Sequence, residues 1–194
     1  AQVTWLDDNS VKIEARELNS QALDLKAVKR IRSSVLLLGP LSARLDAFVL
    51  PEPGGCVIGA RPVNTHLDAL EKLGVRVTET AEGYDIDTRG KKTGKVVLKE
   101  LSVTATENAL MLAASLPGKT TIKIAACEPH IEDLCRFLVG MGAEISGIGT
   151  HTLEVTGRER LSGAEHTVMP DHNEAATFLI LGAATGSRLT VENA

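Results

Sequence analysis

The chain has 194 residues, of which 43% are hydrophobic and 24% are charged, and its formal net charge is −4 at pH 7. This composition is typical of a folded protein of one domain or two small ones, and it excludes a disordered chain. The acidic balance, with no basic cluster larger than Lys91-Lys92, argues against a partner such as nucleic acid or an anionic membrane. An aromatic content of 3% also argues against binding of single strands, which requires stacking side chains.

No segment has the length of a membrane span. The longest apolar stretch, Ala175 to Ala184, has about ten residues, whereas a span needs about twenty, and it predicts a buried helix. The amino terminus lacks a basic and apolar leader. The three cysteines, Cys56, Cys127 and Cys135, are odd in number and lack the spacing of metal ligands. We therefore expect a reduced, cytoplasmic protein without a metal site.

The first predicted elements are two strands, Val3 to Leu6 and Val11 to Glu14, in which apolar and polar residues alternate. A helix is expected around Leu36. The segment 51–56 is rich in Pro and Gly and has no counterpart later in the chain. An insertion of this composition between regular elements predicts a surface loop that can move as a lid.

The second half of the chain predicts two helices, Thr106 to Leu116 and Asn173 to Ala184, that are apolar almost all round from Ala109 and from Ala176 onward. Helices of this kind are buried on every side, so we expect the sheets to lie outside them. The other predicted elements are strands at Thr120 to Ile124, Ala143 to Ser146, Thr152 to Thr156 and His166 to Val168, a helix from Glu128 to Gly142, and an extended run at Leu189 to Glu192.

The order of these elements repeats. Pro62 precedes Pro129 by about 67 residues, and Glu107 precedes Glu174 by the same interval. The repeated unit is βαβαββ, and both ends of the chain fall inside a unit. We therefore expect a fragment of a longer repeat protein.

One segment, PGGCVIGARPVNTHLDALEKLG from Pro53 to Gly74, resembles the active-loop segment of the UDP-N-acetylglucosamine enolpyruvyl transferase family. Four more segments resemble the family in the same order. They are RSSVLLLGPLSAR (Arg32 to Arg44), LSVTATENALMLAASLPGKTTI (Leu101 to Ile122), EPHIEDLCRFLVGMGAEISGIGT (Glu128 to Thr150) and GAEHTVMPDHNEAATFLILGA (Gly163 to Ala183).

The resemblance implies transfer of the enolpyruvyl group of phosphoenolpyruvate to the 3-hydroxyl of UDP-N-acetylglucosamine, with release of phosphate and without a cofactor. It also implies an α/β fold of two domains, each an inside-out α/β barrel of three βαβαββ units, with the active site between them. On this map residues 1–170 are most of one domain, divided into the end of one repeat (1–31), a second repeat (32–105) and a third (106–170). Residues 171–194 begin the second domain.

The resemblance assigns three residues to catalysis and to phosphoenolpyruvate. Cys56 matches the loop cysteine that serves in proton delivery to the methylene carbon and that the epoxide antibiotic fosfomycin alkylates. Arg61 matches the arginine that holds phosphoenolpyruvate, since a guanidinium offers two hydrogen bonds to phosphate. Arg32 matches an arginine of the nucleotide and closure region. The residues by themselves also allow an incidental loop cysteine and surface ion pairs at both arginines.

The resemblance assigns two further segments to the sugar nucleotide. Pro62, Val63, Asn64 and His66 match the segment that grips uracil, and Ser102, Val103 and Thr104 match the segment that receives the diphosphate and ribose, where helix-start amides suit phosphate oxygens. A last match is Asp171 at the crossing between domains. Its position before an apolar helix equally predicts a helix N-cap.

Four residues depart from the family pattern. Asn64 stands in place of Asp, Thr104 in place of Gly, and Cys127 and His130 in place of the Arg and Glu that flank the EP dipeptide. The early lysine and the general base of the family have no matching positions. We therefore expect negligible turnover by this chain without the rest of its parent chain. Since the last repeat is incomplete, we also expect the chain to self-associate through the apolar helix 175–184 or to pack this helix differently from the family.

Two alternatives stay open. One keeps the fold and acts on shikimate 3-phosphate, although the cysteine loop argues against it. The other is a non-catalytic relative that binds a nucleotide sugar, which the four departures support.

Overall fold

In the computed structural model, which describes residues 1–55 and 62–194, the chain divides into two units, Ala1–Ala164 and Glu165–Ala194. The strands of the first unit are β1 (Gln2–Trp5), β2 (Val11–Glu14), β3 (Ala47–Pro51), β4 (Arg76–Thr80), β5 (Gly83–Asp87), β6 (Lys95–Val97), β7 (Gly118–Lys123), β8 (Glu144–Ser146) and β9 (Thr152–Gly157). Its helices are η1 (Ser20–Ala22), α1 (Leu25–Val28), η2 (Arg32–Leu37), α2 (Leu38–Arg44), α3 (Asn64–Lys72), α4 (Val103–Ala113) and α5 (Pro129–Gly140). The second unit contains α6 (His172–Thr185).

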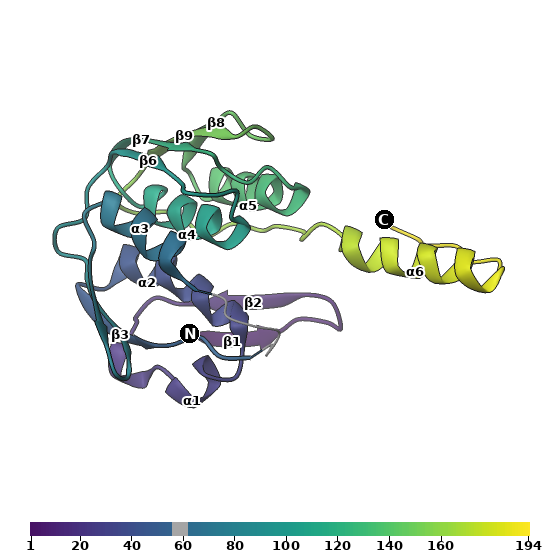
Figure 1. The fold of residues 1–194 in the computed structure, drawn as a ribbon, viewed down its shortest axis with the longest axis horizontal. Helices are drawn as coiled ribbons and strands as arrows, with labels where there is room; N and C mark the ends of the chain where they lie inside the picture. The colour runs from purple at the N-terminus through teal and green to yellow at the C-terminus, as the bar shows by residue number, and fades with distance from the viewer. Residues whose placement is uncertain (56–61) are drawn as a thin grey trace. The chain divides into compact units, whose positions relative to one another are not determined.

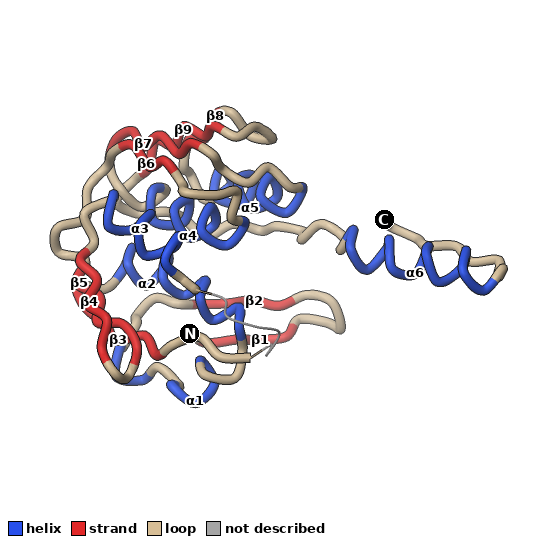
Figure 2. The backbone as a smooth tube through the Cα atoms, viewed as in Figure 1, coloured by secondary structure: helices blue, strands red, loops and turns tan. Residues whose placement is uncertain are grey.

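Two sheets lie outside the helices of the first unit (Figures 1 and 2). One has the antiparallel order β3-β5-β4. The other has the order β6-β7-β9-β8, in which β6 and β7 are parallel and the remaining pairs are antiparallel. Strands β1 and β2 form a separate antiparallel hairpin. The predicted arrangement, with helices inside and sheets outside, is confirmed for this unit.

Helix α4 is the centre of the packing. It contacts α2, α3 and α5 on its sides and strands β7 and β9 beyond them. Its side chain Asn108 is fully buried, donates from Nδ2 to the Val35 carbonyl at 3.1 Å, and accepts the Gly39 amide at 2.6 Å. A Cβ at Gly39 would lie 2.7 Å from the Asn108 carbonyl oxygen, so glycine allows α2 to approach α4 closely.

Helix α6 corrects the prediction of a second buried helix. Its apolar side chains are exposed, with exposed fractions from 45% at Phe178 to 68% at Ile180, and Gly182 is its one buried residue. Burial requires partner elements as well as apolar residues, and within Glu165–Ala194 the segment after α6 has no helix or strand. In the described part of the chain, no helix combines the length and apolar character that a membrane crossing requires.

Two other predictions need correction, because the segments 166–168 and 189–192 are not strands. The segment 51–56 is described only as far as Gly55. Pro51 ends β3, and residues 52–55 form a loop in which Glu52 and Gly55 are exposed and Pro53 is buried. Gly54 packs against the backbone of Lys29, where a side chain would collide with the carbonyl group.

Candidate functional site

The residues matched to the sugar nucleotide lie at the amino-terminal ends of two neighbouring helices. Helix α3 begins at Asn64, helix α4 begins at Val103, and the two helices pack against each other. The first amide groups of a helix have no partner within the helix, and the helix dipole makes this end attractive to anions. Two such ends therefore lie in one region, where the helix-start amides of both can face one anion.

The two ends are built differently. The Ser102 side chain caps α4 and accepts the Ala105 amide at 3.4 Å, so this helix begins at Val103, three residues earlier than its apolar pattern predicts. Val63 occupies the cap position of α3, is buried, and makes no capping bond with its side chain. Pro62 and Asn64 on either side of it are exposed. The exposed amide of Asn64 can donate and accept hydrogen bonds.

Hydrogen bonds connect the two helix ends. His66 Nε2 lies 2.7 Å from Thr104 Oγ1, and Thr65 donates from its hydroxyl to Glu100 Oε1 at 2.9 Å. His66 is 6% exposed, and its burial lowers its pKa below the usual value. The positive charge of Arg32 acts in the same direction, whereas the Val63 carbonyl and the Glu100 carboxylate act against it.

Arg32 lies close to this region and to the start of the inserted segment. It is half-buried at the start of η2, and its Nη1 donates to the Pro53 carbonyl at 3.3 Å. Two other predicted site residues, Cys56 and Arg61, lie outside the described residues.

Asp171 has the capping role that its sequence position allows. Its carboxylate accepts the amides of Asn173 at 2.9 Å and Glu174 at 3.2 Å at the start of α6. It belongs to the second unit, Glu165–Ala194. The structure thus brings together His66 and Thr104, joins Arg32 to Pro53 at the start of the inserted segment, and shows Asp171 as the cap of α6.

Sequence reasoning missed a pair of carboxylates, Glu107 in α4 and Glu128 at the start of α5. Burial raises the pKa of Glu107 in α4 to about 7, and the negative charge of Glu128 adds to the effect. Glu128 occupies the cap position of α5, and among the described residues its Oε2 is buried without a hydrogen-bond partner. The sequence feature that could have revealed this pair is Glu107, a single acidic residue within an apolar helix.

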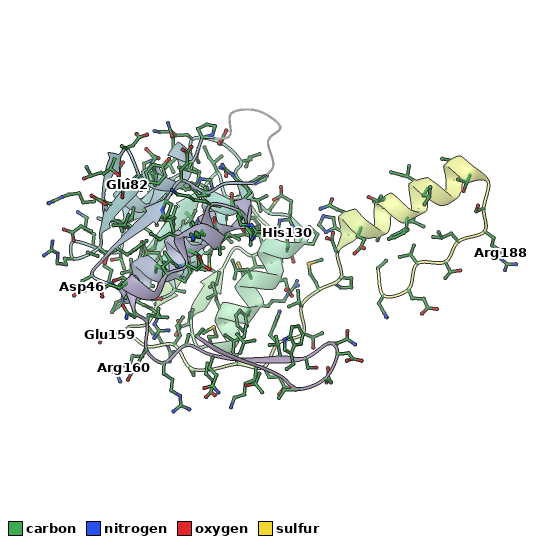
Figure 3. The ribbon with its side chains drawn as sticks, turned by 90° about the horizontal axis from the view of Figure 1, so that it is seen from below. Asp46, Glu82, His130, Glu159, Arg160 and Arg188 are labelled. Carbon is green, nitrogen blue, oxygen red and sulfur yellow. The ribbon has the colours of Figure 1, made fainter. Side chains whose placement is uncertain are left out.

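Two departures from the family pattern, Cys127 and His130, stand on either side of this cap. His130 lies in the first turn of α5 (Figure 3). Cys127 is half-exposed, with its sulfur 3.9 Å from His151 Nε2, and His151 Nδ1 lies 2.7 Å from the Ala125 carbonyl. The third cysteine, Cys135, is buried, and burial raises the pKa of its thiol to about 11.

The described residues offer no obvious metal site, because they contain no group of three His, Cys, Asp or Glu side chains placed to hold an ion. A groove of about 660 Å³ lies on β3, β4 and β5 beneath the segment 20–25, and its lining includes Val49 and Thr78. This groove does not include the paired ends of α3 and α4.

Comparison with known proteins identifies the family of the chain. The family profile of EPSP synthase (3-phosphoshikimate 1-carboxyvinyltransferase) matches residues 1–194. The chain is 46% identical over 197 residues to a UDP-N-acetylglucosamine 1-carboxyvinyltransferase of Shewanella amazonensis, and 45% identical to one of Shewanella denitrificans. Each match covers 100% of this chain and 46% of the relative, so the chain spans about half the length of these curated relatives.

Solved structures show the same fold. The enolpyruvyl transferase NikO from Streptomyces tendae superposes with a TM-score of 0.69 at 27% identity, covering 82% of this chain and 38% of that one. An EPSP synthase from Acinetobacter baumannii superposes with a TM-score of 0.60 at 23% identity, covering 77% and 34%. These likenesses confirm the predicted enolpyruvyl transferase fold class, here with an incomplete barrel. The chain belongs to the EPSP synthase (3-phosphoshikimate 1-carboxyvinyltransferase) family.

Proposed function

We propose that this chain is part of an enzyme that transfers the enolpyruvyl group of phosphoenolpyruvate to the 3-hydroxyl of UDP-N-acetylglucosamine and releases phosphate. The observation that carries the proposal is 46% identity, over the whole chain, to a protein named for this sugar nucleotide. The paired ends of α3 and α4 support it, since they offer two sets of helix-start amides to one diphosphate. The reaction would serve peptidoglycan precursor synthesis in the cytoplasm, and through it cell shape and division.

The sugar nucleotide would bind across the two helix ends. Asn64, exposed in the first turn of α3, suits the uracil imide, because its amide oxygen accepts and its amide nitrogen donates. Pro62 and the buried Val63 would contribute shape and backbone groups. Ser102 and Val103 at the start of α4 suit the diphosphate oxygens.

The chemical step would use residues of the inserted segment. Addition of the sugar oxygen to the enol carbon requires a proton at the methylene carbon, and we assign its delivery to the Cys56 thiol. Arg61, and Arg32 beside the segment, would hold the phosphate of phosphoenolpyruvate and neutralise its charge as it leaves. The base that takes the proton of the sugar hydroxyl would come from the part of the relatives' length that this chain does not span. We assign Asp171 to the interface between the domain of residues 1–170 and the domain that begins at residue 171.

The test is phosphate release by the polypeptide at the length of its curated relatives. We expect Cys56→Ser to lower turnover more than about a hundredfold, because a hydroxyl is a far weaker proton donor than a thiol. Cys127→Ser, outside the inserted segment, should stay within about threefold of the wild type. Equal activity of wild type and Cys56→Ser would remove Cys56 from catalysis. Faster turnover of shikimate 3-phosphate than of UDP-N-acetylglucosamine would overturn the assigned acceptor.

Alkylation provides a second test of the same assignment. Fosfomycin should modify Cys56, and UDP-N-acetylglucosamine should accelerate the reaction if its binding closes the segment over Arg61. Cys135 is the internal control, since a buried thiol with a pKa of about 11 reacts slowly at neutral pH. Peptide mapping that finds Cys127 or Cys135 modified before Cys56 would contradict the catalytic assignment.

A further inference from the structure

The imidazole of His66 has a protein partner at each of its two nitrogens. Nδ1 lies 3.2 Å from the Val63 carbonyl, which can only accept a hydrogen bond, so Nδ1 carries the proton. Nε2 lies 2.7 Å from the Thr104 hydroxyl. In a neutral ring protonated at Nδ1, Nε2 is an acceptor, and the Thr104 hydroxyl therefore donates to it.

The surroundings of His66 favour this neutral form. The ring is 6% exposed, and burial is the main reason that its pKa lies below the usual value. Among charged groups, Arg32 from η2 disfavours a second positive charge, and Glu100 before α4 opposes it in part.

A second hydrogen bond runs beside the first. Thr65, the residue before His66, donates to Glu100 at 2.9 Å. The first turn of α3 is therefore tied twice to the segment that leads into and begins α4. Thr104 stands where the resembled family has glycine, and a glycine offers no hydroxyl to His66.

We propose that Thr104 is a positioning residue of the nucleotide site, whose hydroxyl holds His66 in the neutral Nδ1–H form and fixes the amino-terminal end of α3 against that of α4. This inference rests on the proposed function, since the fixed pair of helix ends is what would receive a uridine diphosphate sugar. Because both nitrogens of His66 are engaged inside the protein, His66 acts through helix placement, and recognition of uracil falls to Asn64 and the backbone of 62–64.

The first test observes His66 directly by nitrogen NMR of the imidazole in this chain. The wild type should show a protonated Nδ1 and an acceptor Nε2. Thr104→Val, which is close in shape but lacks the hydroxyl, should shift the Nε2 resonance and raise the pKa of His66 toward its usual value, since the neutral form loses its donor. Thr104→Ser should restore the wild-type value. A His66 resonance and pKa that are identical in the wild type and Thr104→Val would overturn the hydrogen bond.

The second test measures steady-state kinetics with UDP-N-acetylglucosamine in the polypeptide at its relatives' length. Thr104→Val should raise KM for the sugar nucleotide about tenfold while kcat falls less than threefold, because the change displaces a binding site and not the reacting atoms. Thr78→Val, on the exposed strand β4, is the matched control and should leave both constants as in the wild type.

The outcomes separate the two proposals. An altered His66 pKa in Thr104→Val with an unchanged KM would overturn the positioning role. Failure of the wild-type enzyme to bind any uridine diphosphate sugar in calorimetry, with its His66 resonances as expected, would overturn the proposed function and with it the nucleotide role of Thr104. A raised KM that Thr104→Ser rescues supports both.

Discussion

Helices α4 and α6 have similar apolar sequences and opposite environments. Along α4 the residues that face the surrounding elements are buried, including Leu112 at 0% exposure, whereas Leu179, about 67 residues later at the equivalent repeat position, is 53% exposed. Helix α4 is enclosed by α2, α3, α5 and two strands, and α6 has no helix or strand beside it within its own unit. An apolar pattern all round a helix thus shows which side chains can be buried. Whether they are buried depends on the elements that pack against the helix.

The largest difference in the free energy of unfolding should appear when the equivalent leucines of α4 and α6 are replaced by alanine. Leu112→Ala removes a fully buried side chain and leaves a cavity, so the free energy of unfolding should fall by about 3 kcal/mol. Leu179→Ala should change it by less than about 1 kcal/mol, because that side chain is half-exposed already. Urea denaturation of the two variants measures both values. Equal losses would break the comparison and would mean that α6 is covered in solution.

A smaller difference in stability should follow when an asparagine of α4, Asn108, and one of α6, Asn173, are each replaced by alanine. Asn108→Ala removes the acceptor of the Gly39 amide and one of the two hydrogen bonds at the Val35 carbonyl, which keeps the Leu38 amide, and it should cost about 2 kcal/mol. Asn173→Ala, at the exposed start of α6, should cost at most about 0.5 kcal/mol. Thermal unfolding of both variants compares them. A cost near zero for Asn108→Ala would show that water or another group replaces Asn108 as the hydrogen-bond acceptor of the Gly39 amide.

The glutamates at equivalent repeat positions should differ in their pH dependence. Glu107 has a folded pKa of about 7, above its ordinary value of 4.5, so the folded state keeps a proton that the unfolded chain releases between these values. Stability should therefore fall as pH rises from about 4.5 to about 7. Allowing for partial solvent screening, Glu107→Gln should stabilise the chain by about 1 to 2 kcal/mol at pH 8 and add nothing at pH 4.

The control for this experiment is Glu174→Gln in the exposed first turn of α6. It should alter the free energy of unfolding by less than about 0.5 kcal/mol at either pH. A stabilisation by Glu107→Gln that is the same at pH 4 and pH 8 would contradict the raised pKa.

The smallest effect should come from the cap of α6. Asp171→Ala removes the acceptor for the amides of Asn173 and Glu174, and it should weaken α6 by about 0.5 to 1 kcal/mol. Asp171→Asn keeps a capping oxygen and should retain most of the helix. Amide hydrogen exchange along α6 measures the change. Unaltered protection in Asp171→Ala would show that α6 is stabilised by contacts outside its own residues.

Much of the fold could be predicted because its signals are local. The alternation in β1 and β2, the Asp171 cap and the start of α5 after Glu128 all depend on residues a few positions apart. The repeat then predicted the order of elements, and the apolar character of α4 predicted sheets outside helices. Steric and capping preferences act over one or two turns of chain, so a single sequence contains them.

The site could be predicted only as two segments, 62–66 and 102–104. That they meet, through His66 and Thr104 across 38 residues of chain, is a property of helix packing. The same holds for the bonds from Asn108 to α2 and for the raised pKa of Glu107. The sequence by itself determined the elements whose signals lie within a few residues, such as the start of α5 after Glu128 and the cap of α6. The tertiary structure decided which apolar faces are covered and which polar groups meet, because burial and long-range hydrogen bonds depend on the partner that another segment supplies.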